Sequence, residues 1–133
     1  MIAAPEFDWE KKDSAVLEGP YGIVSPSGTT HVVYSADSCS TPEYKLGIMA
    51  LTAGDDPLQR ASWTKSSTPI FETKNGLYGP GHNAFFKSPD GKQDWQVFHA
   101  NLKASDGCGP SRKTFIQPVS WSEDHINLGD PLP

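Results

Sequence analysis

The strongest constraint on the fold is an internal repeat, in which two parts of the chain read alike and in the same order. Gly19–Pro20 and Gly79–Pro80 each lead into an apolar segment. Residues 33–36 (VYSA) are then echoed by residues 97–100 (VFHA), so matching points lie 60 and then 64 residues apart. A repeated unit of this size stacks on its neighbours to cover its apolar faces. The repeat therefore predicts two similar units packed side by side.

Each unit has the pattern of antiparallel β-structure. Short alternating or apolar runs recur between turn signals, while helix-period patterning is nearly absent. Ser25–Gly28 and Ser88–Gly91 place Pro and Gly where tight hairpin turns need them. The predicted strands are Tyr21–Val24, His31–Ser35, Lys45–Leu51, Ser62–Lys65, Asn83–Lys87, Trp95–Ala100 and Thr114–Trp121.

These patterns predict an all-β fold, a partial β-propeller. The length fits one domain, residues 1–133, with the two copies at about 14–66 and 76–122. Each copy is expected to form one blade, with Gly-Pro at the start of its innermost strand. Two blades do not close a ring, because propellers have at least about four. We therefore expect self-association or a further lobe to cover the open blade faces.

Charge and hydropathy exclude two classes of partner. The formal net charge is −5, and the 11 Lys and Arg residues form no basic cluster, which argues against nucleic-acid binding. No run approaches the roughly 20 apolar residues that cross a membrane. The first residues, Met1–Pro5, lack the basic start and apolar run of a secretory signal. Neutral or polar ligands are the expected partners.

The two cysteines, Cys39 and Cys108, leave two interpretations open. No CxxC or HxxxH spacing accompanies them, so they do not indicate a zinc site. They form either one disulfide or two free thiols. Each follows the second predicted strand of its copy, which places both on the same rim of adjacent blades and favours a bridge.

Three further segments carry a family pattern: Ala4–Pro20, Tyr78–Phe85 and Val97–Ala100. They resemble glycoside hydrolase family 43, in particular its arabinofuranosidase and arabinanase branches. The resemblance covers nearly the whole chain and corresponds to the C-terminal part, about two blades, of a five-bladed β-propeller. It implies a secreted enzyme acting on arabinose-containing oligo- or polysaccharides such as plant cell-wall arabinan and arabinoxylan, with no cofactor required.

The resemblance assigns the role of general acid to Glu18, in the Glu-Gly-Pro segment. Inversion at a sugar also needs a general base about 6.5 to 9.5 Å from the acid. The family places this base and a second, pKa-modulating Asp in other blades. Asp8, Asp13, Asp55 and Asp56 do not lie in matching motifs. We therefore expect the isolated chain to be weakly active or inactive.

The resemblance also places His82 at the bottom of a central cavity, near a calcium or sodium ion. One histidine does not make a calcium site, because calcium takes six to eight oxygen ligands. Water would have to supply the ligands and link the ion to His82. Such an ion would be structural.

Sugar contacts are expected from Tyr21 and Tyr78, beside the two Gly-Pro turns, and from Gln117 on the last inner strand. Family members usually carry an Arg two residues before this Gln, where Phe115 stands here. Arg112 lies three residues before Phe115, an odd offset that predicts the opposite face of a strand unless a bulge intervenes. These departures weaken the expected sugar site.

Three functions are compatible with these residues. The first is part of a glycoside hydrolase that becomes active when an N-terminal lobe supplies the missing carboxylates. The second is a non-catalytic carbohydrate-binding module, which the Phe115 departure favours. The third is a self-associating propeller module, in which several copies stack their blades.

Overall fold

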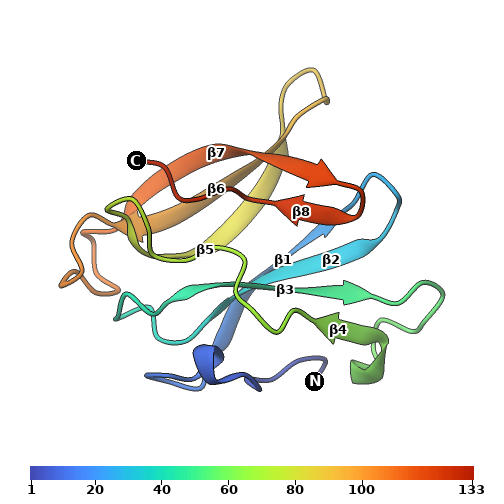
Figure 1. The fold of residues 1–133 in the computed structure, drawn as a ribbon, viewed down its shortest axis with the longest axis horizontal. Coiled ribbons are helices and arrows are strands. Elements are labelled where there is room, and N and C mark those ends of the chain that lie inside the picture. The colour runs from blue at the N-terminus through green and yellow to red at the C-terminus, as the bar shows by residue number, and fades with distance from the viewer.

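The computed structural model describes residues 1–133, and its regular secondary structure is almost entirely antiparallel strands in two four-stranded sheets (Figure 1). The first sheet has the order β1 (Leu17–Val24), β2 (Thr30–Ala36), β3 (Lys45–Leu51) and β4 (Trp63–Lys65). The second has the order β5 (Tyr78–Lys87), β6 (Asp94–Asn101), β7 (Lys113–Ser122) and β8 (His125–Asn127). Consecutive strands pair in both sheets, so each sheet is one propeller blade.

All seven predicted strands are present, and two details differ from the sequence prediction. β8 was missed, because it has only three residues and follows a tight turn. β1 and β5 begin before their Gly-Pro pairs, and the pairing register shifts at both places. Gly19 and Gly79 have φ of 55° and 56°. Such irregularities let a strand contain a proline, which has no N–H for the ladder.

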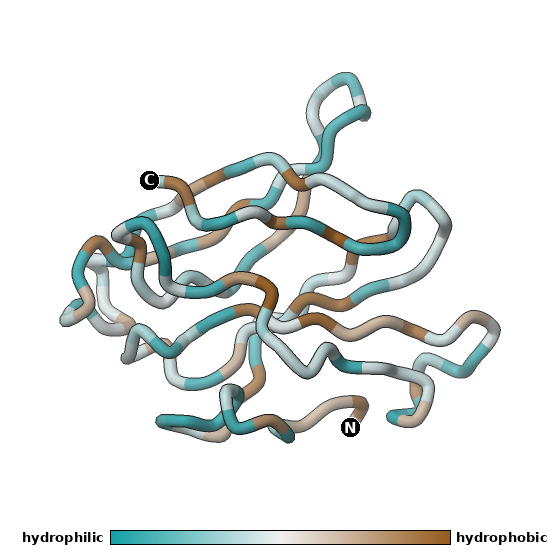
Figure 2. The backbone as a smooth tube through the Cα atoms, viewed as in Figure 1, coloured by the Kyte–Doolittle hydropathy of each residue, from teal (hydrophilic) through white to brown (hydrophobic).

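An apolar core fills the space between the two sheets. Phe71 and Phe98 meet edge to face in it, with ring centroids 4.8 Å apart. Figure 2 shows that hydrophobic residues recur along the strands of both sheets. Burial of this surface is the main stabilising term for the pair of blades. The buried core residues are Ile23, Val33, Leu46, Phe71, Leu77, Phe85, Phe98, Ala100, Val119 and Leu128.

The N-terminal segment covers the other face of the first sheet. Its 3-10 turn η1 (Asp8–Glu10) places the Glu10 side chain at 0% exposure. Tyr34 Oη and Lys65 Nζ donate hydrogen bonds to this carboxylate, at 2.7 and 2.8 Å. The only other helix, η2 (Arg60–Ser62), is also three residues long. Neither helix has the length or the apolar character to cross a membrane.

A disulfide between Cys39 and Cys108 joins the two sheets, with 5.3 Å between the Cα atoms. Cys39 lies after β2 and Cys108 after β6, at the rim where the blades meet. The two free thiols that the sequence left open are therefore not present. The bridge ties the β2–β3 loop to the β6–β7 loop.

Candidate functional site

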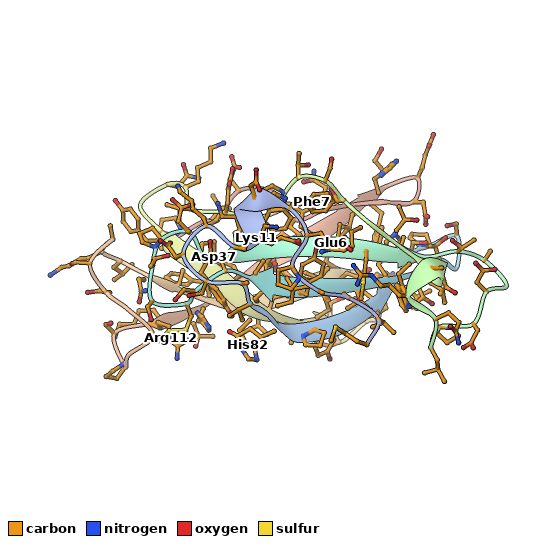
Figure 3. The ribbon with its side chains drawn as sticks, turned by 90° about the horizontal axis from the view of Figure 1, so that it is seen from below. Glu6, Phe7, Lys11, Asp37, His82 and Arg112 are labelled. Carbon is orange, nitrogen blue, oxygen red and sulfur yellow. A yellow bond between two sulfur atoms is a disulfide. The ribbon has the colours of Figure 1, made fainter.

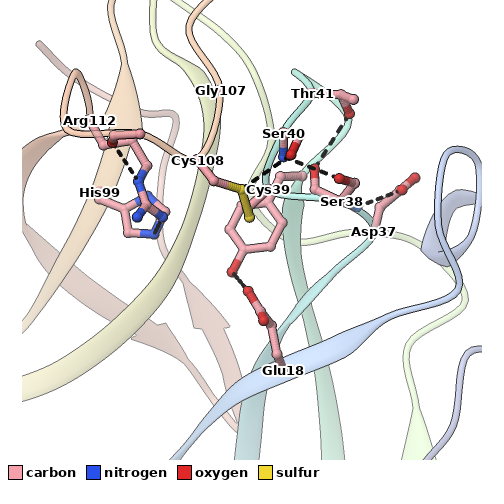
Figure 4. Close-up of a disulfide and its surroundings, with 12 residues drawn as sticks. Glu18, Asp37, Ser38, Cys39, Ser40, Thr41, His99, Gly107, Cys108 and Arg112 are labelled. Carbon is pink, nitrogen blue, oxygen red and sulfur yellow. Dashed lines mark hydrogen bonds between the residues drawn. A yellow bond between two sulfur atoms is a disulfide. The ribbon is translucent and has the colours of Figure 1, made fainter.

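A polar cluster lies at this rim, beside the disulfide (Figure 4). It draws on both blades, because its members come from β1, β2, β5, β6 and the segments that precede β3 and β7. Figure 3 shows two of them, His82 and Arg112, at the same edge of the molecule. The members are Glu18, Ser35, Tyr44, His82, His99 and Arg112.

Glu18 is the carboxylate of the cluster, and Tyr44 is its partner. Tyr44 Oη donates a hydrogen bond of 2.5 Å to Glu18 Oε1. The Tyr44 side chain is fully buried. Burial and the hydrogen bond to Glu18 raise the pKa of Tyr44 above its usual value of 10. The phenol therefore keeps its proton and stays a donor to the carboxylate at neutral pH.

His99 is held as a neutral imidazole. Burial lowers its pKa from 6.5 to about 4, and the positive charge of Arg112 and the neighbouring His82 add to the effect. Arg112 Nη1 lies 3.1 Å from His99 Nε2. Because Arg is always a donor, the neutral ring accepts at Nε2. This hydrogen bond holds the Arg112 guanidinium in a fixed direction within the polar cluster.

The position of Arg112 corrects the sequence prediction, which put it on the opposite face of the last inner strand. Arg112 precedes β7 and belongs to the loop, so strand alternation does not set its direction. Phe115, in the slot where the family usually has Arg, stacks on Phe98 at 5.7 Å and packs against the core. The chain thus places a guanidinium at the rim from a different position.

His82 is exposed on β5 and has a φ of 47°, a conformation that is uncommon for any residue except glycine. Its backbone N–H donates to Ser35 Oγ at 2.7 Å, which ties β5 to β2. A Cβ atom at Gly19 would lie 3.0 Å from the His82 ring. The two Gly-Pro segments therefore approach closely because Gly19 has no side chain.

The chain does not by itself provide a metal site at His82. No group of three or more His, Cys, Asp and Glu side chains comes together in the structure. The cluster offers one carboxylate, which Tyr44 already engages. These residues do not fit a calcium ion, which takes six to eight oxygen ligands. The ion near His82 stays a prediction.

The two tyrosines expected to contact sugar occupy different surroundings. Tyr21 is 42% exposed, and its ring meets Phe85 edge to face at 6.0 Å. Tyr78 is partly buried at the start of β5, opposite Asn101. Tyr21 therefore presents an aromatic surface to solvent, whereas Tyr78 presents less of one.

Gln117 lies outside the cluster, which differs from the sequence prediction. It is buried, and its Nε2 donates to the carbonyl oxygens of Leu128 and Asp130, at 2.5 and 3.1 Å. Its Oε1 accepts from the Leu132 backbone N–H at 3.2 Å. All of its amide atoms are thus used to hold the C-terminal segment, which leaves none for a sugar.

Sequence reasoning missed Tyr44, Ser35 and His99 as members of the site. Ser35 and His99 lie within the repeated VYSA and VFHA segments, and that position was the available signal. Tyr44 lies just before β3, and no local pattern marks its partner, which is 26 residues away. Contacts of this kind depend on how the blades pack.

Comparison with known proteins decides the family. The model of glycosyl hydrolases family 43 matches residues 2–127. The chain belongs to this family. An extracellular exo-α-(1→5)-L-arabinofuranosidase of Streptomyces avermitilis is 41% identical over 98% of the chain, and α-L-arabinofuranosidase B of Pyricularia oryzae is 33% identical over all of it. The chain spans 28% of the length of each.

The solved structures agree with the family-43 assignment. The α-L-arabinofuranosidase of Lactobacillus brevis superposes with a TM-score of 0.90 at 34% identity, over 100% of this chain and 42% of that one. A thermostable family-43 glycoside hydrolase superposes with a TM-score of 0.76 at 30% identity. The two sheets are thus part of a family-43 five-bladed propeller, which confirms the predicted fold class and family.

Proposed function

We propose that this chain supplies the general acid, Glu18, of an arabinofuranoside-cleaving family-43 active site. The observation that carries the proposal is the placement of Glu18 at the rim between two blades, with Oε1 hydrogen-bonded to Tyr44 and Oε2 without a partner. An acid needs one oxygen free to deliver its proton to the leaving glycosidic oxygen. The names of the matching relatives point to arabinofuranosides as substrates and to an extracellular enzyme.

The other groups at the rim suit sugar binding. Arg112 brings donors for sugar hydroxyls, and exposed His82 and Tyr21 bring a polar ring and an aromatic face. Sugar C–H faces pack against aromatic surfaces. In this proposal Glu18 protonates the leaving oxygen, while these side chains orient the arabinofuranosyl ring. We expect Tyr78, at the start of β5, as a further sugar contact.

The general base is expected from outside this chain. Inversion needs a second carboxylate about 6.5 to 9.5 Å from the acid. The two buried carboxylates of the chain, Glu10 and Asp37, are engaged elsewhere: Glu10 by Lys65 and Tyr34, and Asp37 by backbone N–H groups. We therefore infer that the chain alone hydrolyses arabinofuranosides weakly or not at all, and that further blades complete the site.

A chimera tests this proposal. In it the chain replaces the matching segment of the Lactobacillus brevis α-L-arabinofuranosidase, and hydrolysis of para-nitrophenyl α-L-arabinofuranoside is measured. We expect activity from the chimera and near-background rates from the chain alone. Glu18→Gln should lower kcat by about 100-fold or more. Glu72→Gln, at an exposed glutamate, is the matched control and should change little. An active Glu18→Gln chimera would refute the proposal.

A non-catalytic carbohydrate-binding module is the second candidate, and the single carboxylate of the cluster favours it. Titration calorimetry of the chain with arabino-oligosaccharides separates the two. Binding by the chain, together with a folded but inactive chimera, would support the binding module. Activity of the chimera that depends on Glu18 would support the glycosidase.

A further inference from the structure

We propose that Tyr44 is a positioning residue for Glu18: it holds Oε1 and thereby makes Oε2 the oxygen that carries the transferable proton. The inference rests on the proposed role of Glu18 and goes beyond it. The hydrogen bond between Tyr44 Oη and Glu18 Oε1, at 2.5 Å, is the only one that the Glu18 side chain makes in the structure. A carboxyl group with one fixed oxygen has one oxygen left for proton transfer.

Tyr44 can hold this position because its ring packs against residues of the second blade. Tyr44 precedes β3 of the first blade, yet its ring lies parallel to that of His99 on β6, with 5.9 Å between centroids and 2° between planes. The ring also lies directly over Gly81 on β5, where a Cβ atom would collide with it. Tyr44 therefore transmits the position of the second blade to a carboxylate on the first.

The surroundings keep the phenol in its donor form. The ring is fully buried, so it has no water to exchange its hydrogen bond with. Arg112 binds His99 at Nε2 and fixes that ring in turn. Figure 4 shows Glu18, His99 and Arg112 gathered around the Cys39–Cys108 bridge, which joins the loops that lead to Tyr44 and Arg112. The Glu18 carboxyl group therefore has a rigidly held hydrogen-bond partner in Tyr44.

Proton transfer from Glu18 to the glycosidic oxygen then takes place from Oε2. The O–H bond at Glu18 Oε2 breaks as the proton passes to the glycosidic oxygen, and the bond from that oxygen to the anomeric carbon breaks. A water molecule, deprotonated by the general base expected from further blades, forms the new C–O bond at the anomeric carbon. The carboxylate that remains is stabilised by the Tyr44 hydroxyl at Oε1, because a donor to an ionised carboxylate makes a strong hydrogen bond. Tyr44 touches neither the sugar nor the reacting atoms, and it acts through Glu18.

Labelling of carboxyl groups tests this without any hydrolysis. The purified chain is treated with a carbodiimide and glycine ethyl ester over a range of pH, and the labelled peptides are quantified by mass spectrometry. Tyr44→Phe should raise the labelling rate of Glu18 by about fivefold, as expected for loss of one hydrogen bond. In this variant the pH profile of Glu18 labelling should shift to higher pH, because the Glu18 carboxylate loses the Tyr44 hydroxyl as a hydrogen-bond donor. The exposed Glu72 in the same samples is the internal standard.

Tyr34→Phe is the matched control, because Tyr34 is also buried and donates to a glutamate, Glu10, at 2.7 Å. It removes the same atom from the same blade and should leave the rate and pH profile of Glu18 unchanged. Equal labelling of Glu18 in Tyr44→Phe and the unaltered chain would overturn the proposal. A shift of the same size in Tyr34→Phe would do so as well, because it would reveal a general loosening.

A second measurement covers the case in which Tyr44→Phe does not fold. NMR of chain carrying ¹³Cζ-tyrosine reports the hydrogen bond from the other side, and Glu18→Gln should move the Tyr44 resonance. An unmoved resonance would overturn the proposal. Neither measurement involves turnover, so an inactive chimera would refute the proposed function and leave the placement of Tyr44 to be judged on its own.

Discussion

At the scale of single residues, the rim depends on a few close approaches that permit no extra atoms. Gly81 lies under the Tyr44 ring, and Gly19 lies under the His82 ring. Both glycines come from the repeated Gly-Pro segments or the residue after them. The sequence pattern that marked the two blades is therefore also what lets their inner strands approach the Tyr44 and His82 rings.

We expect Gly81→Ala to destabilise the chain by about 1–3 kcal/mol, because the added Cβ collides with the buried Tyr44 ring. Urea unfolding followed by tryptophan fluorescence measures the change. Gly109→Ala is the control, because Gly109 has no atom within 4 Å of the added Cβ and no positive φ. Equal midpoints for the two variants would contradict the packing described for Tyr44.

The lowered pKa of His99 predicts an acid-sensitive stability. Between about pH 6.5 and 4 the unfolded chain binds a proton at this histidine that the folded chain does not, so stability falls as the pH falls through that window. His99→Gln should flatten this part of the curve of unfolding free energy against pH. His125→Gln, at an exposed histidine, should leave it unchanged. Parallel curves for all three proteins would contradict the assignment.

At the scale of elements, the N-terminal segment is anchored by charge as well as by apolar contact. Trp9 and Ile2 pack against Tyr34 and Met49 on the face of the first sheet that lies away from the core. The Glu10 carboxylate is satisfied by backbone N–H groups, Tyr34 and Lys65. This segment completes the first blade in the way a covering strand would.

We expect Glu10→Gln to cost about 3 kcal/mol, because it leaves Lys65, whose side chain is 8% exposed, without its buried counter-charge. In hydrogen exchange, Glu10→Gln should speed the exchange of residues 1–16 relative to the unaltered chain, and should do so more than for β5 to β7. Glu72→Gln, at an exposed glutamate, serves as the comparison and should cost little. Unchanged exchange in the N-terminal segment would contradict its anchoring by Glu10.

At the scale of the whole molecule, two blades are held together by the core between them and by one covalent bond. The Cys39–Cys108 bridge closes a loop with a sequence separation of 69 residues. Replacing both cysteines by serine should therefore lower the unfolding free energy by about 4 kcal/mol, on the chain-entropy estimate. Thermal unfolding with and without reductant measures this. An equal melting temperature with and without reductant would contradict this prediction.

The outer face of the second blade predicts self-association of the isolated chain. Phe86 stacks on Trp95 there and is 42% exposed, and Ile116 is 59% exposed. Sedimentation velocity at rising concentration should show masses above 14.4 kDa. Ile116→Lys should reduce the association, whereas Leu58→Lys, at a residue exposed in the β3–β4 connection, should not. A monomer at all concentrations would contradict this prediction.

The sequence alone was sufficient for the repeat, for every strand except β8, for the hairpin turns at Ser25–Gly28 and Ser88–Gly91, and for the family. These depend on local signals: alternation of apolar residues, Pro and Gly in turns, and short motifs that keep their order along the chain. Gly28 and Gly91, for example, have the positive φ that their predicted turns require. The assignment of Glu18 rests on the same kind of signal, the segment around it, and its role stays a prediction.

Only the tertiary structure decided which side chains meet Glu18. Tyr44 and Arg112 lie in loops, where no strand period fixes the direction of a side chain, and the packing of one blade on the other brings them to the rim. Gln117 lies in its predicted strand, yet its side-chain amide is hydrogen-bonded to the C-terminal segment. No local sequence pattern predicts this contact. Local periodicity determines elements, whereas long-range packing determines the partners of each polar group.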